Sequence, residues 1–147
     1  EIVRVNDNIK ERETIYLTIY EGIDNNELMI LHEKGNIENN IKGDVKIFIN
    51  LINNTHFQRK GLDLIYIKEI SLKDALCGFL FNIQYIDERI IRIQNKKGTI
   101  VFPEYEKKIP NLGMKREGIY GELIIKFKIV FPYNLTSSQI ESISQIL

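Results

Sequence analysis

The sequence predicts an all-β protein with one short internal helix and one carboxy-terminal helix. Apolar and polar residues alternate with period two in several short segments, and Gly, Asn and Asp separate these segments. The chain contains 28 Ile and 14 Asn but a single Ala. β-branched residues suit an extended backbone, whereas so few alanines disfavour an Ala-rich helical bundle.

In the first third of the chain we expect three strands, over residues 14–20, 28–31 and 44–51. In the first of them Ile15, Leu17 and Ile19 share one face. The aromatic residues Tyr16, Tyr20 and Phe48 lie on the nominally polar faces, where they cover a second layer or leave an apolar surface for a partner. The polar residues 53–55 then mark the boundary between two small β units.

Beyond this boundary we expect strands over residues 63–69, 79–85, 89–94, 98–102 and 122–131. A short helix lies between the first two, because Ser71 can cap its amino end, Asp74 favours the helix dipole and Gly78 can end it. A second helix is expected in residues 135–147, where Thr136 and Gln139 have capping-box spacing. A helix this short needs its apolar stripe covered.

Charge and composition exclude several classes of function. The 147 residues carry 20 basic and 20 acidic side chains and have a pI near 7.0, so no basic excess attracts nucleic acid or an anionic membrane. No apolar run approaches the roughly 18 residues that span a bilayer. Cys77 is the only cysteine, which excludes an intrachain disulfide and a cysteine zinc cluster. We therefore expect no metal, cofactor, nucleic acid or membrane partner.

An enzyme is the least favoured class. Cys77 could act as a thiolate nucleophile only beside His32 or His56. Its place at the end of the expected helix, next to Leu76 and Phe79, favours a small buried apolar group instead. The glycines match no phosphate-binding pattern and are expected in turns.

Five segments, in order, carry the most specific pattern of the chain. The first two are the Gly-Asp strand opening at Gly43 and the His-Phe-Gln-Arg-Lys-Gly-Leu-Asp-Leu junction that begins at His56. The third is Ile-Ser-Leu-Lys-Asp-Ala-Leu-Cys-Gly, from Ile70. The last two are a Gly-Met turn at Gly113 and the strand Gly-Glu-Leu-Ile-Ile-Lys-Phe-Lys-Ile-Val-Phe-Pro from Gly121. Together these segments resemble the carboxy-terminal region of the J-domain (DnaJ, forty-kilodalton heat-shock) co-chaperones, and the resemblance extends over most of the chain.

The resemblance implies two β-sandwich subdomains in series, the first incomplete, followed by a dimerisation segment. Their expected bounds are 1–55, 56–133 and 134–147. In such a protein the stripe of Ile140, Ile143 and Leu147 is apolar because a second copy of the chain buries it.

The resemblance also implies a shallow groove in the first subdomain that accepts unfolded polypeptide as an added strand. By position in the family motif, Ile15 and Leu17 fall on the strand lining this groove and Phe57 on its aromatic wall. The alternative is that Ile15 and Leu17 are ordinary core residues. The implied protein is a non-enzymatic, cytoplasmic co-chaperone that hands clients to a seventy-kilodalton heat-shock chaperone.

Some family features are missing from this sequence. It contains no His-Pro-Asp tripeptide and no Cys-x-x-Cys-x-Gly-x-Gly repeats. We also expect the opening strands of the first subdomain to be absent from it. A second hypothesis is therefore a dimerisation scaffold that binds no client.

Overall fold

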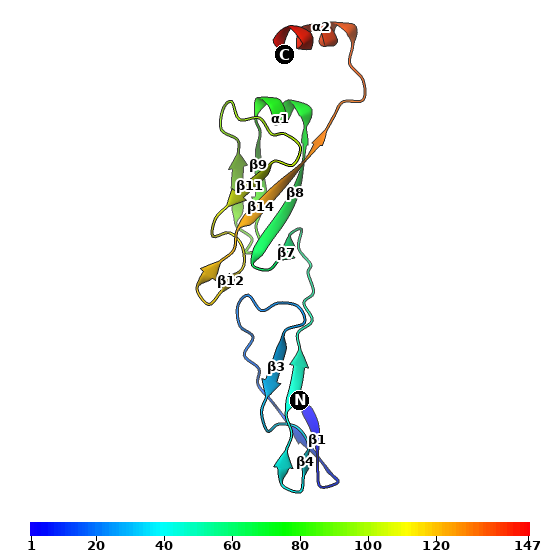
Figure 1. The fold of residues 1–147 in the computed structure, drawn as a ribbon, viewed down its shortest axis with the longest axis vertical. Helices are drawn as coiled ribbons and strands as arrows, with labels where there is room; N and C mark the ends of the chain where they lie inside the picture. The colour runs from blue at the N-terminus through cyan, green and yellow to red at the C-terminus, as the bar shows by residue number, and fades with distance from the viewer.

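A computed structural model describes residues 1–147 as an elongated chain of two strand-rich parts and a terminal helix (Figure 1). The first part holds the amino terminus, and the second part lies between it and the terminal helix. No strand pairing joins the strands of residues 2–48 to those of residues 58–130. The predicted all-β class is confirmed, because strands dominate and the two helices are short.

The fourteen strands and two helices follow one another along the chain. They are β1 (Ile2–Asn6), β2 (Ile9–Glu13), β3 (Leu28–Leu31), β4 (Ile37–Glu38), β5 (Ile41–Lys42), β6 (Val45–Phe48), β7 (Gln58–Lys60), β8 (Asp63–Ser71), α1 (Leu72–Cys77), β9 (Leu80–Gln84), β10 (Ile90–Gln94), β11 (Glu106–Ile109), β12 (Lys115–Arg116), β13 (Ile119–Tyr120), β14 (Leu123–Val130) and α2 (Ser137–Ile146).

The first part consists of two small sheets. One has the strand order β2-β1-β4-β5, and the other pairs β3 with β6 in antiparallel register. The β1–β2 hairpin, which the sequence analysis did not predict, turns on Asp7 and Asn8, both with positive φ (39° and 76°). Two-residue hairpin loops favour Asn and Asp at such positions because these residues tolerate the left-handed region.

Two expected strands are not formed. Residues 14–20 are neither helix nor strand, since no neighbouring strand completes a ladder with them. Residues 98–102 also form no strand. Instead the N–H of Val101 donates to the carbonyl of Ala75 at 2.9 Å, and the Val101 side chain is buried against α1. In residues 98–102 the alternation of apolar residues thus reflects the burial of Val101 and not pairing with another strand.

The second part is a layered β structure that holds the core. A four-stranded sheet has the order β11-β14-β8-β7, with β8 and β14 parallel along eight residue pairs. The β9–β10 hairpin packs on it, so that Ile83 and Ile93 meet Leu64, Leu123 and Ile125 in one buried cluster. In the first part, by contrast, Gly22 is the one buried residue and no side chain is buried. The two parts therefore differ sharply in how much apolar surface they remove from water.

Helix α1 has the ends that the sequence predicts. The N–H of Asp74 donates to Ser71 Oγ at 3.0 Å, and the N–H of Gly78 donates to the carbonyl of Asp74. Ala75 is the buried residue of this helix. Cys77, expected to be buried, is exposed, because α1 turns Ala75 and not Cys77 toward the sheet.

Helix α2 begins with the predicted capping box. Gln139 N–H donates to Thr136 Oγ1, and the N–H of Thr136 donates to the Gln139 side chain at 2.9 Å. The helix has no buried residue, and its backbone makes no close contact with another helix or strand. The helix is thus held by its own backbone hydrogen bonds and its capping box, while its apolar residues are left exposed.

Arg59 of β7 fastens the two parts together. Its guanidinium donates to the carbonyls of Gly22 and Ile23, each at 2.7 Å, and to the carbonyl of Gly61 at 2.8 Å. The side chain is only 11% exposed. Gly22 also lies close to Lys115, since a Cβ on it would lie 2.3 Å from the carbonyl oxygen of Lys115.

Two ion pairs complete this junction. Arg116 of β12 donates to both carboxylate oxygens of Glu27, and Lys115 Nζ lies 3.1 Å from Glu21. The hydrogen bond from Arg116 is the main cause that lowers the pKa of the Glu27 carboxyl below its ordinary value of 4.5. The turn at residues 20–27 is therefore held by β7 and by the β12–β13 hairpin.

We expect Arg59→Ala to loosen this junction. Each hydrogen bond to a charged donor contributes about 1.5–3 kcal/mol, and two of the three cross between the parts. Spin labels on Cys77 and on a Lys42→Cys variant should give a narrow distance distribution in the parent and a broad one in Arg59→Ala. Arg92→Ala, on the exposed side of β10, is the control. An equally narrow distance distribution in Arg59→Ala would show that Arg59 does not hold the two parts together.

Candidate peptide-binding and dimerisation surfaces

Ile15 lies at a cleft in the first part. The cleft has a volume of about 430 Å³ and is lined on one side by residues 13–16 and on the other by the end of β3 and the residues after it, including Ile30 and His32. Ile15 is half-buried, and Ile30 is exposed. The cleft thus offers apolar side chains to solvent between an unpaired segment and a strand.

Charged groups surround this apolar surface. Glu13 is paired with Lys34 and lies 3.0 Å from Arg4. The hydrogen bond from Lys34 is the main cause that lowers the pKa of the Glu13 carboxyl. On the other side His32 Nδ1 lies 3.2 Å from Asp44 Oδ2. The cleft is therefore lined by apolar side chains and by polar groups of Glu13, His32 and Lys34 that already have partners.

The other residues of the 14–20 segment are largely exposed. Leu17 is 40% exposed and does not line the cleft, and Tyr16 is 90% exposed. Tyr20 and Phe48 are also exposed, so neither covers a second layer here. These aromatic residues were expected either to cover a second layer or to form an exposed apolar surface, and the structure agrees with the exposed surface.

Phe57 does not lie on the wall of this cleft. Its side chain is 3% exposed and belongs to the core of the second part. The ring lies edge-on to Tyr85 at 5.8 Å between centroids and 5.5 Å from Tyr66. Because a buried ring cannot contact a peptide while the core is closed, the structure replaces the expected peptide contact of Phe57 with a packing role.

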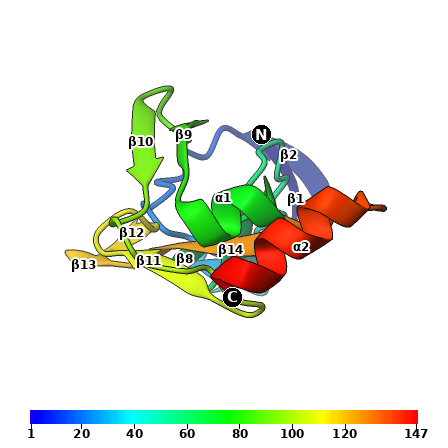
Figure 2. The ribbon, with the colours of Figure 1, turned by 90° about the horizontal axis from the view of Figure 1, so that it is seen from above.

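The expected dimerisation residues lie at the other end of the molecule. An apolar cleft of about 460 Å³ lies among α2, the end of β14 and α1. Figure 2, the view from above, shows α1 and α2 at this end of the molecule. Ile143 lines this cleft together with Leu72, Leu76, Phe131 and Leu135. Ile140 and Leu147 do not line it and are exposed. Of the three residues of the stripe, only Ile143 therefore lines this cleft.

Apart from these clefts, neither the single cysteine nor the His, Asp and Glu side chains form a recognisable reactive or metal-binding group. Cys77 makes no side-chain hydrogen bond, and no group of three or more His, Cys, Asp or Glu side chains is placed to hold a metal ion. Neither helix has the length and apolar character needed to cross a bilayer.

These features define a class of protein, namely a β-rich chain with apolar clefts at both ends and a capped terminal helix. Residues 2–132 match the DnaJ C-terminal domain. The chain therefore belongs to the DnaJ C-terminal domain family.

Individual relatives agree with this assignment. The chain is 30% identical to "Chaperone protein dnaJ 2" of Arabidopsis thaliana, over 95% of this chain and 34% of that protein. It is 34% identical to "DnaJ homolog subfamily A member 1 homolog" of Dictyostelium discoideum, over 95% of this chain and 31% of that protein. The chain is also 34% identical to "DnaJ homolog subfamily A member 4" of Mus musculus, over 88% of this chain and 34% of that protein. The chain thus spans about a third of the length of these curated relatives.

Sequence reasoning did not find the partners of Ile15 or the junction at Arg59. Ile30 and His32 lie some fifteen residues beyond Ile15 and carry no local signal of proximity to it. Arg59 stands in a polar stretch that reads as an ordinary surface, and only the fold brings it against Gly22.

Proposed function

We propose that this chain is the part of a J-domain co-chaperone that binds unfolded polypeptide and dimerises. Within a longer cytoplasmic protein it would help to deliver clients to a seventy-kilodalton heat-shock chaperone. In this proposal residues 1–55 belong to the client-binding subdomain, 56–133 form the second subdomain and 134–147 the dimerisation segment. No enzymatic step is involved.

The cleft at Ile15 is the observation that carries the proposal. Beside it, residues 14–20 form no strand pairing, so their backbone groups, apart from the carbonyl of Tyr20 that accepts from Ile23, are available to an added strand. Main-chain hydrogen bonds provide affinity that tolerates many sequences, while an apolar cleft accepts an occasional large side chain. Leu17 lies two residues further along the same segment and would contact the peptide outside the cleft.

Two copies joined through α2 would hold two such clefts on one client. Linking sites in this way raises apparent affinity through effective concentration, so that a weak, shallow cleft suffices. The exposed apolar side chains of α2 support this part of the proposal, since a helix of this length gains little stability alone.

We expect Ile15→Asp to weaken binding of a fluorescent, extended apolar peptide by about tenfold or more, because a charge would enter an apolar contact. Fluorescence anisotropy measures this affinity. Ile52→Asp places the same charge at an exposed side chain of the first part, outside both the cleft and residues 14–20, and should change binding little.

The same titration separates the two hypotheses. A folded dimer that shows no saturable binding would support the scaffold and contradict the client-binding proposal. Equal losses in both aspartate variants would show that the cleft is not the contact. Phe57→Ala is a poor test of binding, because it would damage the core.

A further inference from the structure

Strand β8 leaves most of one edge open. Along its other edge it pairs with β14 from Leu64 to Ser71, but β7 pairs with it only as far as Ile65, opposite Gln58. The N–H of Leu64 donates to the carbonyl of Glu122 at 2.9 Å, so the even-numbered residues of β8 direct their backbone groups toward β14. The N–H and C=O groups of Ile67 and Glu69 therefore point to the open edge.

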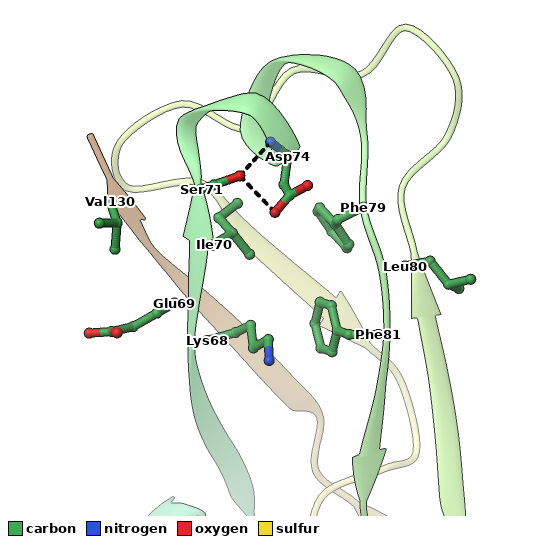
Figure 3. Close-up of a pocket in the computed structure, with 9 residues that line it drawn as sticks. All are labelled: Lys68, Glu69, Ile70, Ser71, Asp74, Phe79, Leu80, Phe81 and Val130. Carbon is green, nitrogen blue, oxygen red and sulfur yellow. Dashed lines mark hydrogen bonds between the residues drawn. The ribbon is translucent and has the colours of Figure 1, made fainter. Parts of the chain in front are cut away.

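A cleft of about 380 Å³ lies beside this edge (Figure 3). The side chains of Lys68 and Ile70 point from β8 toward Phe79 and Phe81, which come from the start of β9 and the residue before it. The two rings lie 5.3 Å apart and are partly exposed. An apolar side chain entering here would meet aromatic surface.

The position of Lys68 favours an acidic group beside Phe81. Glu69 points away from Phe79 and Phe81 and is paired with Lys128 at 2.6 Å. Lys68 has no ion pair, and its ammonium lies 4.9 Å from the centroid of the Phe81 ring. Asp74 also lines the cleft, where it accepts a hydrogen bond from Ser71 at 2.8 Å but has no cationic partner. The cleft therefore carries one unpaired cation beside Phe81 and one carboxylate on α1.

We propose that the open edge of β8 is a second peptide site, which takes an extended polypeptide segment with a large apolar residue two positions from an acidic one. Lys68 and Ile70 are also two positions apart on one face of β8, so successive inward side chains of an added strand would meet them in turn. The apolar side chain lies against the partly exposed ring of Phe79, next to the buried Ile70, and the carboxylate lies at Lys68. The site is separate from the cleft at Ile15 and rests on the proposed function only for the class of ligand.

Backbone hydrogen exchange tests where the peptide binds. The probe is a peptide with Phe-Thr-Asp between Ser and Thr residues, added to the full chain and followed by NMR. The amides of Ile67 and Glu69 should exchange more slowly with peptide, because an added strand accepts hydrogen bonds from them. Protection confined to the first part of the chain would overturn this inference and leave the proposed function standing. No protection anywhere would overturn both.

Ile67 offers a matched pair of variants. Ile67→Pro removes the outward N–H and should weaken peptide binding about fivefold, whereas Ile67→Ala keeps this donor and should bind nearly as the parent does. Neither change removes a hydrogen bond to β14. Equal affinity of the proline variant and the parent would overturn the proposal.

The charge can be tested without disturbing the backbone. Lys68→Glu should weaken binding of the Phe-Thr-Asp peptide about two- to fivefold, and a Phe-Thr-Lys peptide should regain that loss. If the Lys68→Glu variant still preferred the Phe-Thr-Asp peptide over the Phe-Thr-Lys peptide, the role of Lys68 would be contradicted. Protection of Ile67 and Glu69 that grows with protein concentration, without peptide, would instead assign the edge to a second copy of the chain.

Discussion

Leu123→Ala is expected to lower the free energy of unfolding of the second part by about 2–5 kcal/mol, the range for truncating a fully buried Leu. Leu123 has no exposed surface and lies on β14, the strand that joins β8 to β11. Its side chain belongs to the cluster that includes Leu64 and Ile83. Urea unfolding followed by circular dichroism measures the change.

Ile119→Ala is the control for this experiment. Ile119 is 65% exposed in β13, so its truncation should shift stability by roughly 0.5 kcal/mol or less. Similar losses in the two variants would mean that the cluster around Leu123 is not the main source of stability.

Ile143→Asp is expected to dissociate the proposed dimer. Ile143 is the member of the predicted stripe that reaches the apolar cleft beside α1. Ile143 is 42% exposed in the single chain, so in this proposal a second copy buries it. A charge buried in that contact would cost about 3 kcal/mol or more, which is at least a hundredfold in the dissociation constant. Sedimentation equilibrium over a range of concentrations measures it.

Ser142→Asp places the same charge on α2 at an exposed position and should leave the dimer intact. Dissociation by both variants would point to a weakened helix and not to a lost contact. A parent chain that is monomeric at all concentrations would contradict the dimer itself.

Local signals predicted a large part of the fold. The strand over residues 28–31 and both helix caps follow from alternation and from capping residues, which act within a few positions of the chain. The β1–β2 hairpin was missed because β2 is dominated by charged residues, such as Lys10 and Arg12. Residues 14–20 have a strand pattern but no partner, and a strand requires both.

The candidate sites were harder to predict, because they depend on which segments meet. Alternation placed Ile15 on an apolar face but could not identify Ile30 across the cleft. The family motif placed Phe57 beside a peptide, whereas the fold buries its ring between Tyr66 and Tyr85. The open edge of β8 follows from the shortness of β7, which no residue pattern announces.

The uneven core has a consequence for the order in which the chain is synthesised. A ribosome releases residues 1–55 first, and these residues bury no side chain of their own. Their anchors, Arg59 and Arg116, are translated later, and Arg116 emerges only after some sixty more residues. We therefore expect the first part to become ordered after the second, against the direction of translation.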